Sequence, residues 1–365
     1  MSQYSRRKFL QQLGAGIILL PGVPRFVHAA VPRSDKKLGI ALIGLGSYST
    51  YELAPALLET RNCRLAGIVT GTPEKAAKWK ERYKIPEKNI YNYQNFDAIA
   101  DNDDIDAVYV VLPNSMHHEF TLRAAAAGKH VICEKPMAVS VTECTEMINA
   151  CRKAGVRLLI GYRLHFDPYH QAAMKFRMSK EAGQLHTVDA AFAFRIGDPT
   201  QWRLKKSLAG GGPLMDLGIY CIQASRYSTG SEPLTATATI EEKTDPKKFA
   251  EVEETIRWQL EFPDSVTATS MCSYNKQANY LKLTSENGWL ELQSAFSYGG
   301  ISGRTNTGTL DFPHINQQAL QLDGFSRCIT DHLESDADGE EGRKDMKVIE
   351  AIYRSAATGM KESVK

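Results

Sequence analysis

From Leu38 onward, the sequence alternates short apolar segments with segments of helical length, and this alternation limits the fold more than any other feature. Strands of a parallel sheet are buried on both faces, so they are continuously apolar, and a helix usually connects one to the next. We therefore predict a doubly wound α/β domain. Its expected strands are 38–43, 64–70, 106–112, 130–133 and 157–161, and its expected helices are 51–60, 73–83, 115–127 and 140–154.

The pattern changes after Gly161. Longer and partly alternating apolar segments predict a second, α+β domain with a large, open and mostly antiparallel sheet. A length of 365 residues is also typical of about two domains. We assign 38–161 to the first domain and 162–365 to the second. The expected strands of the second domain are 184–196, 234–242, 251–262, 265–274, 279–285 and 288–293, with helices at 214–229, 316–334 and 343–359.

The composition is that of an ordinary globular protein, with 43% hydrophobic residues, 24% charged residues and a net charge of +2. This balance argues against a disordered chain, a coiled coil and a protein that grips nucleic-acid phosphates. Seven cysteines without a C-x-x-C pair indicate free thiols instead of a disulfide framework or a zinc knuckle.

The amino terminus has the features of an export signal. Two adjacent arginines, Arg6 and Arg7, precede a mildly apolar segment at 13–23, and Val27 and Ala29 then supply small enough residues at the −3 and −1 positions of a cleavage site. Glycines and prolines in this region disfavour the alternative, a basic amphipathic helix, and the apolar segment is too short for a lasting membrane anchor. We predict a twin-arginine signal peptide at 1–29 and a periplasmic location. Twin-arginine export carries folded proteins, so it also favours a bound cofactor.

A glycine-rich turn, Gly44-Leu45-Gly46, lies where the first strand ends and the first helix begins. Gly44 permits the tight turn, and Gly46 lets the backbone approach a pyrophosphate at the helix N-terminus. Ser49 replaces the third glycine of the usual pattern by another small residue. The motif predicts a Rossmann dinucleotide-binding domain; the alternative is a glycine-rich turn in another kind of α/β domain.

The tip of the second strand bears on the choice between NAD and NADP. NAD-binding folds usually place an Asp or Glu there for the ribose hydroxyls, whereas this chain has Thr70, with Thr72 and Lys75 close behind. Hydroxyl groups and a cation suit a 2′-phosphate, so we predict NADP. Lys75 could instead be a solvated helix residue.

Candidate catalytic residues follow the fifth strand and a glycine hinge. Glu134 and Lys135 come directly after the strand at 130–133, at the edge of the sheet where ligands bind. Asp216 and Tyr220 are four residues apart on the helix expected after Gly210–Gly212, so both project from one face. A lysine beside a phenol favours the phenolate, and a carboxylate can orient the lysine. The set is suited to moving the proton of an alcohol as it is oxidised.

At these motifs the sequence resembles the Gfo/Idh/MocA oxidoreductase family, and within it the branch of periplasmic glucose–fructose oxidoreductases. The resemblance extends over nearly the whole mature chain. Many family members have His where this chain has Tyr220. The matching segments are 44–46, 90–97, 112–115, 133–138, 161–163, 201–204, 208–212, 215–220, 339–342 and 351–353.

The resemblance implies a Rossmann domain, followed by a substrate domain whose open sheet makes homo-oligomer contacts, in a dimer or a tetramer. It implies that Lys135, Asp216 and Tyr220 are the catalytic set, with Tyr220 as the acid/base, and that Trp202 and Arg203 form a clamp over the nicotinamide. The implied cofactor neighbours are Gly44, Gly46, Ser47, Tyr48, Thr70, Lys75, Asn114, Glu134, Lys135, Arg163, Trp202 and Arg203.

One departure concerns the short arm at 30–37. The glucose–fructose enzymes have a longer, proline-rich arm that wraps a partner subunit and helps to retain the cofactor. Permanent retention of NADP, and the tetramer that accompanies it, therefore do not follow from the resemblance for this chain.

The leading hypothesis is an NADP-dependent sugar oxidoreductase that oxidises a cyclic aldose at C1 to a lactone and then reduces a second sugar. The alternatives are a simple NADP-dependent sugar dehydrogenase, an NAD-dependent glycosidase of the same superfold, and a cofactor-binding protein without catalysis. Segments 195–205 and 296–315 are expected to be loops that shape the sugar pocket, with His165 a further candidate for its lining. No metal site is expected, since the neighbouring His117 and His118 point apart on a helix.

Overall fold

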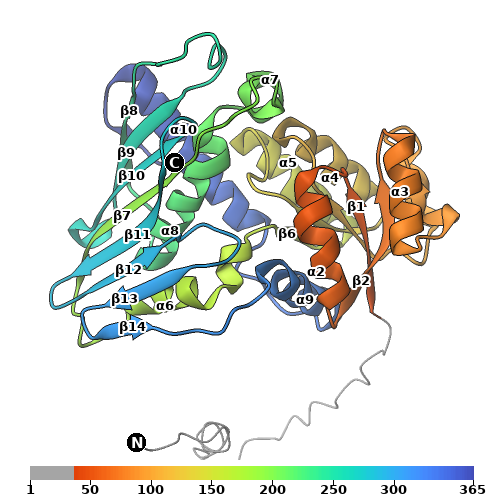
Figure 1. Cartoon of the computed structure of the whole chain (residues 1–365), viewed down its shortest axis with the longest axis horizontal. Helices are drawn as coiled ribbons and strands as arrows, with labels where there is room; N and C mark the ends of the chain where they lie inside the picture. The colour runs from red at the N-terminus through yellow and green to blue at the C-terminus, as the bar shows by residue number, and fades with distance from the viewer. Residues whose placement is uncertain (1–36) are drawn as a thin grey trace, which may run out of the picture. The chain divides into compact units, whose positions relative to one another are not determined.

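The computed structural model describes residues 37–365 (Figure 1). The predicted signal peptide at 1–29 and all but the last residue of the arm at 30–37 lie outside the described residues. Within 37–365, no helix combines the length and the apolar character that crossing a bilayer requires.

The first sheet confirms the Rossmann prediction. It has six parallel strands in the order β3-β2-β1-β4-β5-β6, which is the doubly wound order of dinucleotide-binding folds. The sequence pattern missed β3, which is only two residues long. The strands are β1 (Leu38–Ile43), β2 (Cys63–Val69), β3 (Ile90–Tyr91), β4 (Ala107–Val110), β5 (His130–Cys133) and β6 (Leu158–Ile160).

Four helices connect these strands and cover the parallel sheet (Figure 1). They are α2 (Ala54–Glu59), α3 (Pro73–Tyr83), α4 (His117–Ala126) and α5 (Val141–Ala154). A π-helical turn at Ser49–Leu53 precedes α2. The strand order reverses between β1 and β4, and the crevice at such a switch point is where ligands bind in open α/β sheets.

The second sheet confirms the predicted open, mostly antiparallel sheet. Its nine strands have the order β14-β13-β12-β11-β7-β10-β9-β8-β15, and among the described pairs only β7 and β10 run parallel. The strands are β7 (Leu185–Ala193), β8 (Thr235–Ile240), β9 (Thr255–Glu261), β10 (Thr267–Ser273), β11 (Ala278–Ser285), β12 (Trp289–Gln293), β13 (Ser302–Thr305), β14 (Gly308–Leu310) and β15 (Glu362–Ser363).

The expectation that 296–315 is all loop is wrong. Ser302–Thr305 and Gly308–Leu310 form a hairpin that pairs with β12 and extends the sheet. These strands are short and bury few side chains, so they lack the apolar alternation by which the other strands were predicted.

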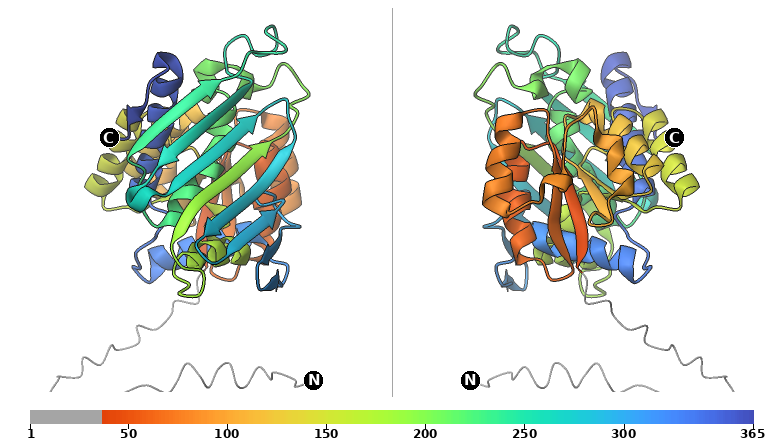
Figure 2. Two further views of the ribbon diagram at one scale, coloured as in Figure 1. Left: turned by 90° about the vertical axis from the view of Figure 1, so that its left-hand side faces the viewer. Right: turned by 90° about the vertical axis from the view of Figure 1, so that its right-hand side faces the viewer.

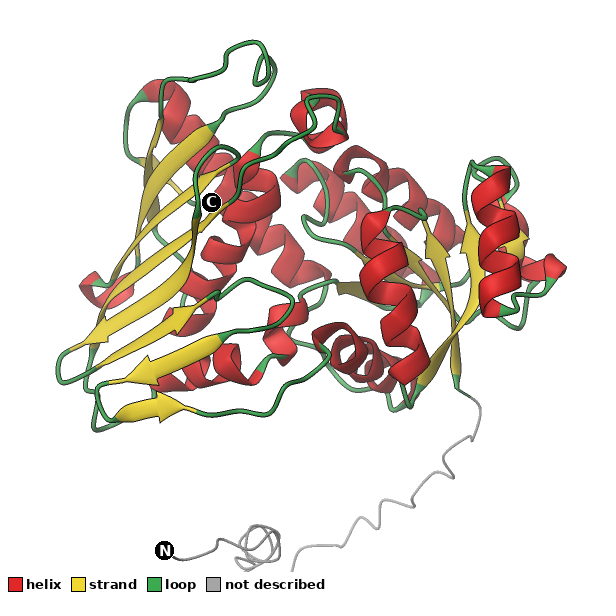
Figure 3. Cartoon of the chain, viewed as in Figure 1, coloured by secondary structure: helices red, strands yellow, loops and turns green. Residues whose placement is uncertain are grey.

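Helices line one face of the large sheet and separate it from the parallel sheet, as the colouring of Figure 3 makes clear. Among the described residues, no helix covers the opposite face, which turns toward the viewer in the left panel of Figure 2. The helices are α6 (Pro168–Phe176), which the sequence pattern missed, α7 (Lys206–Ala209), α8 (Ile219–Thr229), α9 (Gln317–Thr330) and α10 (Gly339–Thr358).

The last two helices join the two halves of the chain. Asp323 of α9 accepts hydrogen bonds from the backbone N–H groups of Arg61 and Asn62, at the turn between α2 and β2. Asp338 accepts a hydrogen bond from the Glu341 N–H at 3.1 Å and caps α10, which begins at Gly339 instead of near residue 343.

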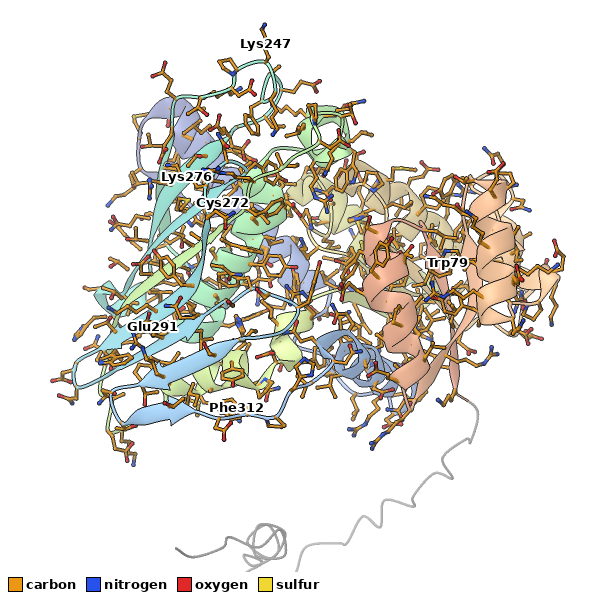
Figure 4. All side chains as sticks on the ribbon, in the orientation of Figure 1. Trp79, Lys247, Cys272, Lys276, Glu291 and Phe312 are labelled. Atoms are coloured by element: carbon orange, nitrogen blue, oxygen red, sulfur yellow. The ribbon has the colours of Figure 1, made fainter. Side chains whose placement is uncertain are left out.

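The described cysteines are all free, and all except Cys328 are buried. Cys272 of β10, labelled in Figure 4, is one of the buried thiols. The expectation of free thiols is confirmed.

Candidate active site

A cavity of about 1190 Å³ lies at the carboxyl ends of the parallel strands, and elements of both sheets line it. It brings together every residue that the sequence analysis assigned to the cofactor or to catalysis. Those residues are Gly44, Gly46, Ser47, Tyr48, Thr70, Lys75, Asn114, Glu134, Lys135, Arg163, Trp202, Arg203, Asp216 and Tyr220.

The glycine turn has the shape of a pyrophosphate seat. Gly44 has a φ of +91°, and a Cβ there would lie 2.4 Å from the carbonyl oxygen of Val111, so only glycine fits. At Gly46, by contrast, a Cβ would meet no protein atom within 4 Å. The space above Gly46 opens into the cavity, and the first N–H groups of the following helix have no partner within that helix. The residues present therefore fit a dinucleotide phosphate.

The end of the cavity beyond β2 contains hydroxyl groups and one cation. The buried Thr70 accepts a hydrogen bond from the Thr72 N–H, and the Lys75 ammonium donates to the carbonyl oxygen of Leu45 at 3.2 Å. The ring of Tyr93, which the sequence analysis missed, covers Gly71, because a Cβ on that glycine would lie 3.0 Å from the ring. This end can hold an adenosine group and offers a positive charge to a phosphate on it.

Lys135 lines the cavity and lies beside both other predicted catalytic residues. Its ammonium donates to the Asp216 backbone oxygen at 2.9 Å and to Asp216 Oδ1 at 3.3 Å, and it is 4.6 Å from the ring centroid of Tyr220. Burial by itself would lower the pKa of Lys135, but Tyr220 and Asp216 raise it above its ordinary value. Lys135 therefore remains an ammonium ion.

Asp216 is a largely buried carboxylate that accepts hydrogen bonds from three side chains. Besides Lys135, Oδ2 accepts hydrogen bonds from Arg203 Nε at 2.9 Å and from the Tyr274 hydroxyl at 3.1 Å. Burial would raise the pKa of Asp216, but Arg203 and Lys135 outweigh it and hold the pKa below its ordinary value. Arg203 also lies 4.7 Å from the ring centroid of Trp202, so the predicted clamp is fixed to the carboxylate.

The helix that carries Asp216 and Tyr220 is held at its start by Glu253. This buried carboxylate of the segment before β9 accepts hydrogen bonds from the backbone N–H groups of Gly212 and Leu214, at 3.0 and 3.1 Å. The hydroxyl of Tyr353 donates to the same carboxylate at 2.9 Å. A π-helical turn, Leu214–Gly218, then leads into α8. Glu253 thus fixes the glycine hinge from which both side chains extend into the cavity.

Arg163 lines the cavity, and its two terminal nitrogens donate hydrogen bonds to protein. They donate to the carbonyl oxygens of Phe296 and Ser297, at 2.6 and 3.0 Å, and to the side chain of Gln317. The guanidinium also stacks on the aromatic rings of Tyr220 and Tyr298, at 5.1 and 4.4 Å from their centroids. It therefore fixes the part of the cavity wall that contains Tyr220 and Tyr298.

Glu134 and Asn114 complete the rim of the parallel sheet. Glu134 accepts a hydrogen bond from the Tyr109 hydroxyl at 2.5 Å, and burial raises the pKa of Glu134 above its ordinary value. Asn114 donates from Nδ2 to the carbonyl oxygen of Ala209 at 2.8 Å and so ties the parallel sheet to α7.

Several aromatic residues of the large sheet and its loops also line the cavity, and the sequence analysis missed them. Phe192 and Phe296 pack against Tyr220, with centroids 5.5 and 6.0 Å from its own. No motif marks them, because an aromatic residue in a strand or loop is usually a core residue. Phe192 and Phe296 reach the same side of Tyr220's cavity only through the tertiary fold.

Of the other sequence candidates, His165 does not line the cavity. It packs against Phe166 and Tyr227. The ring of His117 lies between the carbonyl oxygens of Pro136 and Leu112, and His118 faces Glu146. Residues 37–365 contain no group of three metal-ligating side chains.

Comparison with known proteins agrees with this architecture. A model of an oxidoreductase family with an NAD-binding Rossmann fold matches residues 38–162, and a model of the Gfo/Idh/MocA C-terminal domain matches residues 170–292. The crystal structure of an aldose-aldose oxidoreductase from Caulobacter crescentus superposes with a TM-score of 0.87 and 45% identity, over 90% of this chain and 100% of that chain.

Two archaeal proteins are also similar along most of their length. An NADP(+) D-xylose 1-dehydrogenase of Haloarcula marismortui is 29% identical over 89% of this chain and 92% of its own. A second such enzyme, of Haloferax volcanii, is 29% identical over 88% and 97%. The family models, the full-length relatives and the cavity agree: the chain belongs to the Gfo/Idh/MocA oxidoreductase family and is an NAD(P)-dependent oxidoreductase.

Proposed function

We propose that this protein is an NADP-dependent sugar oxidoreductase that oxidises a cyclic aldose at C1 to a lactone and reduces a second sugar without releasing the cofactor. The observation that carries the proposal is the contact of Lys135, Asp216 and Tyr220 inside the cavity that also contains the glycine turn. Relatives whose names describe aldose and xylose oxidation support sugars as the substrate class.

The residues of the glycine turn and of the β2 tip would hold the dinucleotide. Gly46 and Ser47 offer backbone to the pyrophosphate, and Lys75 offers its charge to a 2′-phosphate. The nicotinamide, when bound, supplies a centre that accepts a hydride and can give it back. Thr70 in place of a carboxylate supports NADP over NAD and disfavours the NAD-dependent glycosidase.

Tyr220 is placed to move the proton that accompanies the hydride. The donor sugar loses the hydrogen on C1 as a hydride and the hydroxyl hydrogen as a proton, and the carbon–oxygen single bond becomes a carbonyl. In its phenolate form Tyr220 takes that proton and becomes the neutral phenol, while the Lys135 ammonium, held by Asp216, keeps a positive charge beside the ring. In the second half of the cycle Tyr220 returns the proton to the oxygen of the acceptor sugar, so the two halves balance.

We propose a periplasmic location, after twin-arginine export and removal of residues 1–29. An exported enzyme has no access to the cytoplasmic pool of NADP, which favours reoxidation of the cofactor in place over a simple dehydrogenase. We also propose that the face of the large sheet left uncovered by helices makes the homo-oligomer contacts that the family implies.

An absorbance spectrum of the purified native protein tests the proposal. We expect an NADPH band at 340 nm that appears when a donor aldose is added and disappears when a carbonyl sugar follows, with no added nucleotide. Tyr220→Phe should bind NADP and show no such cycle. Turnover that needs added NADP and a single sugar would identify a simple dehydrogenase instead.

A further inference from the structure

Tyr298 is a cavity residue that no sequence motif marks. It lies in the loop between β12 and β13, and 48% of its surface is exposed although its ring borders the cavity. Its ring is stacked on that of Tyr48, with centroids 5.8 Å apart and planes 28° apart. Tyr48 belongs to the first helix of the Rossmann domain, whereas Tyr298 belongs to a loop of the large sheet. The two rings therefore connect the two sides of the cavity.

The loop before Tyr298 is firmly anchored. Arg163 donates to the carbonyl oxygens of Phe296 and Ser297, and its guanidinium lies 4.4 Å from the Tyr298 centroid. Asn279 of β11 accepts a hydrogen bond from the Phe296 N–H at 2.8 Å and donates to the Ser297 hydroxyl at 2.9 Å. These contacts fix the position from which the Tyr298 ring extends.

The loop after Tyr298 consists of two glycines that pack against little. Gly300 has a φ of +70°, and a Cβ on it would meet no atom within 4 Å, while a Cβ on Gly299 would meet only His314. A side chain anchored on one flank and followed by two glycines can turn without disturbing the sheet. Little packing on the glycine flank therefore opposes a local movement of the Tyr298 ring.

The ring pair also lies beside the proposed pyrophosphate seat. Tyr48 follows Gly46 and Ser47 in the chain, and all of them line the same cavity as Tyr298. A dinucleotide on the glycine turn would lie within reach of both rings. The exposed part of Tyr298 is then apolar surface that such a ligand would cover.

We propose that the Tyr48–Tyr298 pair is a latch that slows release of the bound dinucleotide, with Tyr298 as its positioning residue from the substrate domain. This inference rests on the proposed function, in which NADP stays bound between the two half-reactions. Release requires the rings to separate and Tyr298 to leave the Arg163 guanidinium.

The test is the release rate of NADPH from the loaded full-length protein. NADPH-loaded protein is mixed with excess NADP in a stopped-flow instrument, and the loss of NADPH fluorescence is followed. We expect Tyr298→Ala to release NADPH about 5- to 30-fold faster, because an aromatic pair and a cation–π contact are lost. Tyr298→Phe, which keeps the ring, should release it at nearly the wild-type rate.

Tyr51→Ala is the matched control, because Tyr51 lies on the same helical segment as Tyr48 and is 73% exposed. It should leave the release rate unchanged. Equal release by wild type and Tyr298→Ala, in a protein that binds NADPH, would overturn the latch and leave the proposed function standing. Failure of the wild-type protein to bind NADPH would overturn both.

Discussion

Lys135 and Asp216 keep each other charged although both side chains are largely buried. Only 12% of the Lys135 side chain and 14% of the Asp216 side chain are exposed. A single unpaired charge buried to this extent would cost free energy. Here the two charges face each other, and Arg203 and Tyr274 donate hydrogen bonds to the second oxygen of the Asp216 carboxylate. The cluster therefore presents a fixed ammonium beside Tyr220, the residue that we propose transfers the proton.

Replacing Tyr220 tests this assignment. Tyr220→Phe removes the hydroxyl and keeps the ring that packs against Phe192 and Phe296. We expect kcat to fall by roughly 10²- to 10⁴-fold, because general acid–base catalysis is lost. The dissociation constant of NADP, measured by fluorescence titration, should change little. An unchanged kcat would show that another group moves the proton.

Replacing Lys75 tests the choice of cofactor. Its ammonium lies at the end of the cavity where the sequence lacks a carboxylate. Lys75→Ala should weaken NADP binding by about 1.5–3 kcal/mol, the range of a hydrogen bond to a charged group, and should leave NAD binding nearly unchanged. Isothermal titration with both nucleotides measures the difference. Equal affinities of the wild-type protein for NADP and NAD would contradict the assignment.

The Asp216 ion pairs predict a dependence of stability on pH. The pKa of Asp216 is lower in the folded protein than its ordinary value, so the carboxylate stabilises the fold above the ordinary value, and this stabilisation is lost as the pH falls toward the folded pKa. We expect the stability gap between wild type and Asp216→Asn to be widest near pH 7 and to narrow below about pH 4, near the ordinary pKa of Asp. Urea unfolding across this range measures it, and a gap that stays constant would contradict the prediction.

At the scale of elements, α8 is fixed near both ends. Glu253 holds the segment before the helix, and Arg226 in its last turn donates to Asp345 of α10 at 2.6 Å and to Glu232 and Glu341, both at 2.7 Å. The Arg226 side chain is 2% exposed and that of Asp345 is fully buried. This network joins α8 to α10, which in turn packs against strands of both sheets.

Arg226→Ala should therefore destabilise the fold strongly. It leaves the Asp345 carboxylate buried without its cation, which typically costs about 3–5 kcal/mol. The control is Arg327→Ala, since Arg327 is 53% exposed and pairs with Asp331 four residues away at 3.5 Å. That change should alter the free energy of unfolding by no more than about 0.5 kcal/mol. Similar losses for the two variants in chemical denaturation would show that the buried network contributes little.

At the scale of the whole molecule, the proposed periplasmic location would favour reoxidation of the cofactor in place, so the export signal is the feature to test. We expect replacement of Arg6 and Arg7 by lysines to leave the precursor uncut in the cytoplasm, because the twin-arginine pair is the feature by which the pathway recognises its substrates. Cell fractionation followed by N-terminal sequencing measures the outcome, with a mature start near Ala30 in the unmodified protein. Normal export of the double-lysine variant would refute the assignment of the signal.

The sequence by itself determined the features that depend on neighbouring residues. Three local patterns could be recognised in this way: the apolar segments of the parallel sheet, the Gly44-Leu45-Gly46 turn and the Asp216–Tyr220 spacing. The residues of the last two patterns line the cavity in the structure. The short β3 and the β13–β14 hairpin were missed because they bury too few side chains to produce such a pattern.

The tertiary structure decided what depends on residues far apart in the chain. Tyr274 reaches Asp216 across 58 residues, and Arg163 holds the loop at Phe296 across 133. Tyr298 meets Tyr48 only because the two sheets face one cavity. A lone tyrosine in a loop has no periodicity and no fixed spacing to a partner, so its role follows from packing alone. The sequence thus located the chemistry, whereas folding selected the side chains that hold and enclose it.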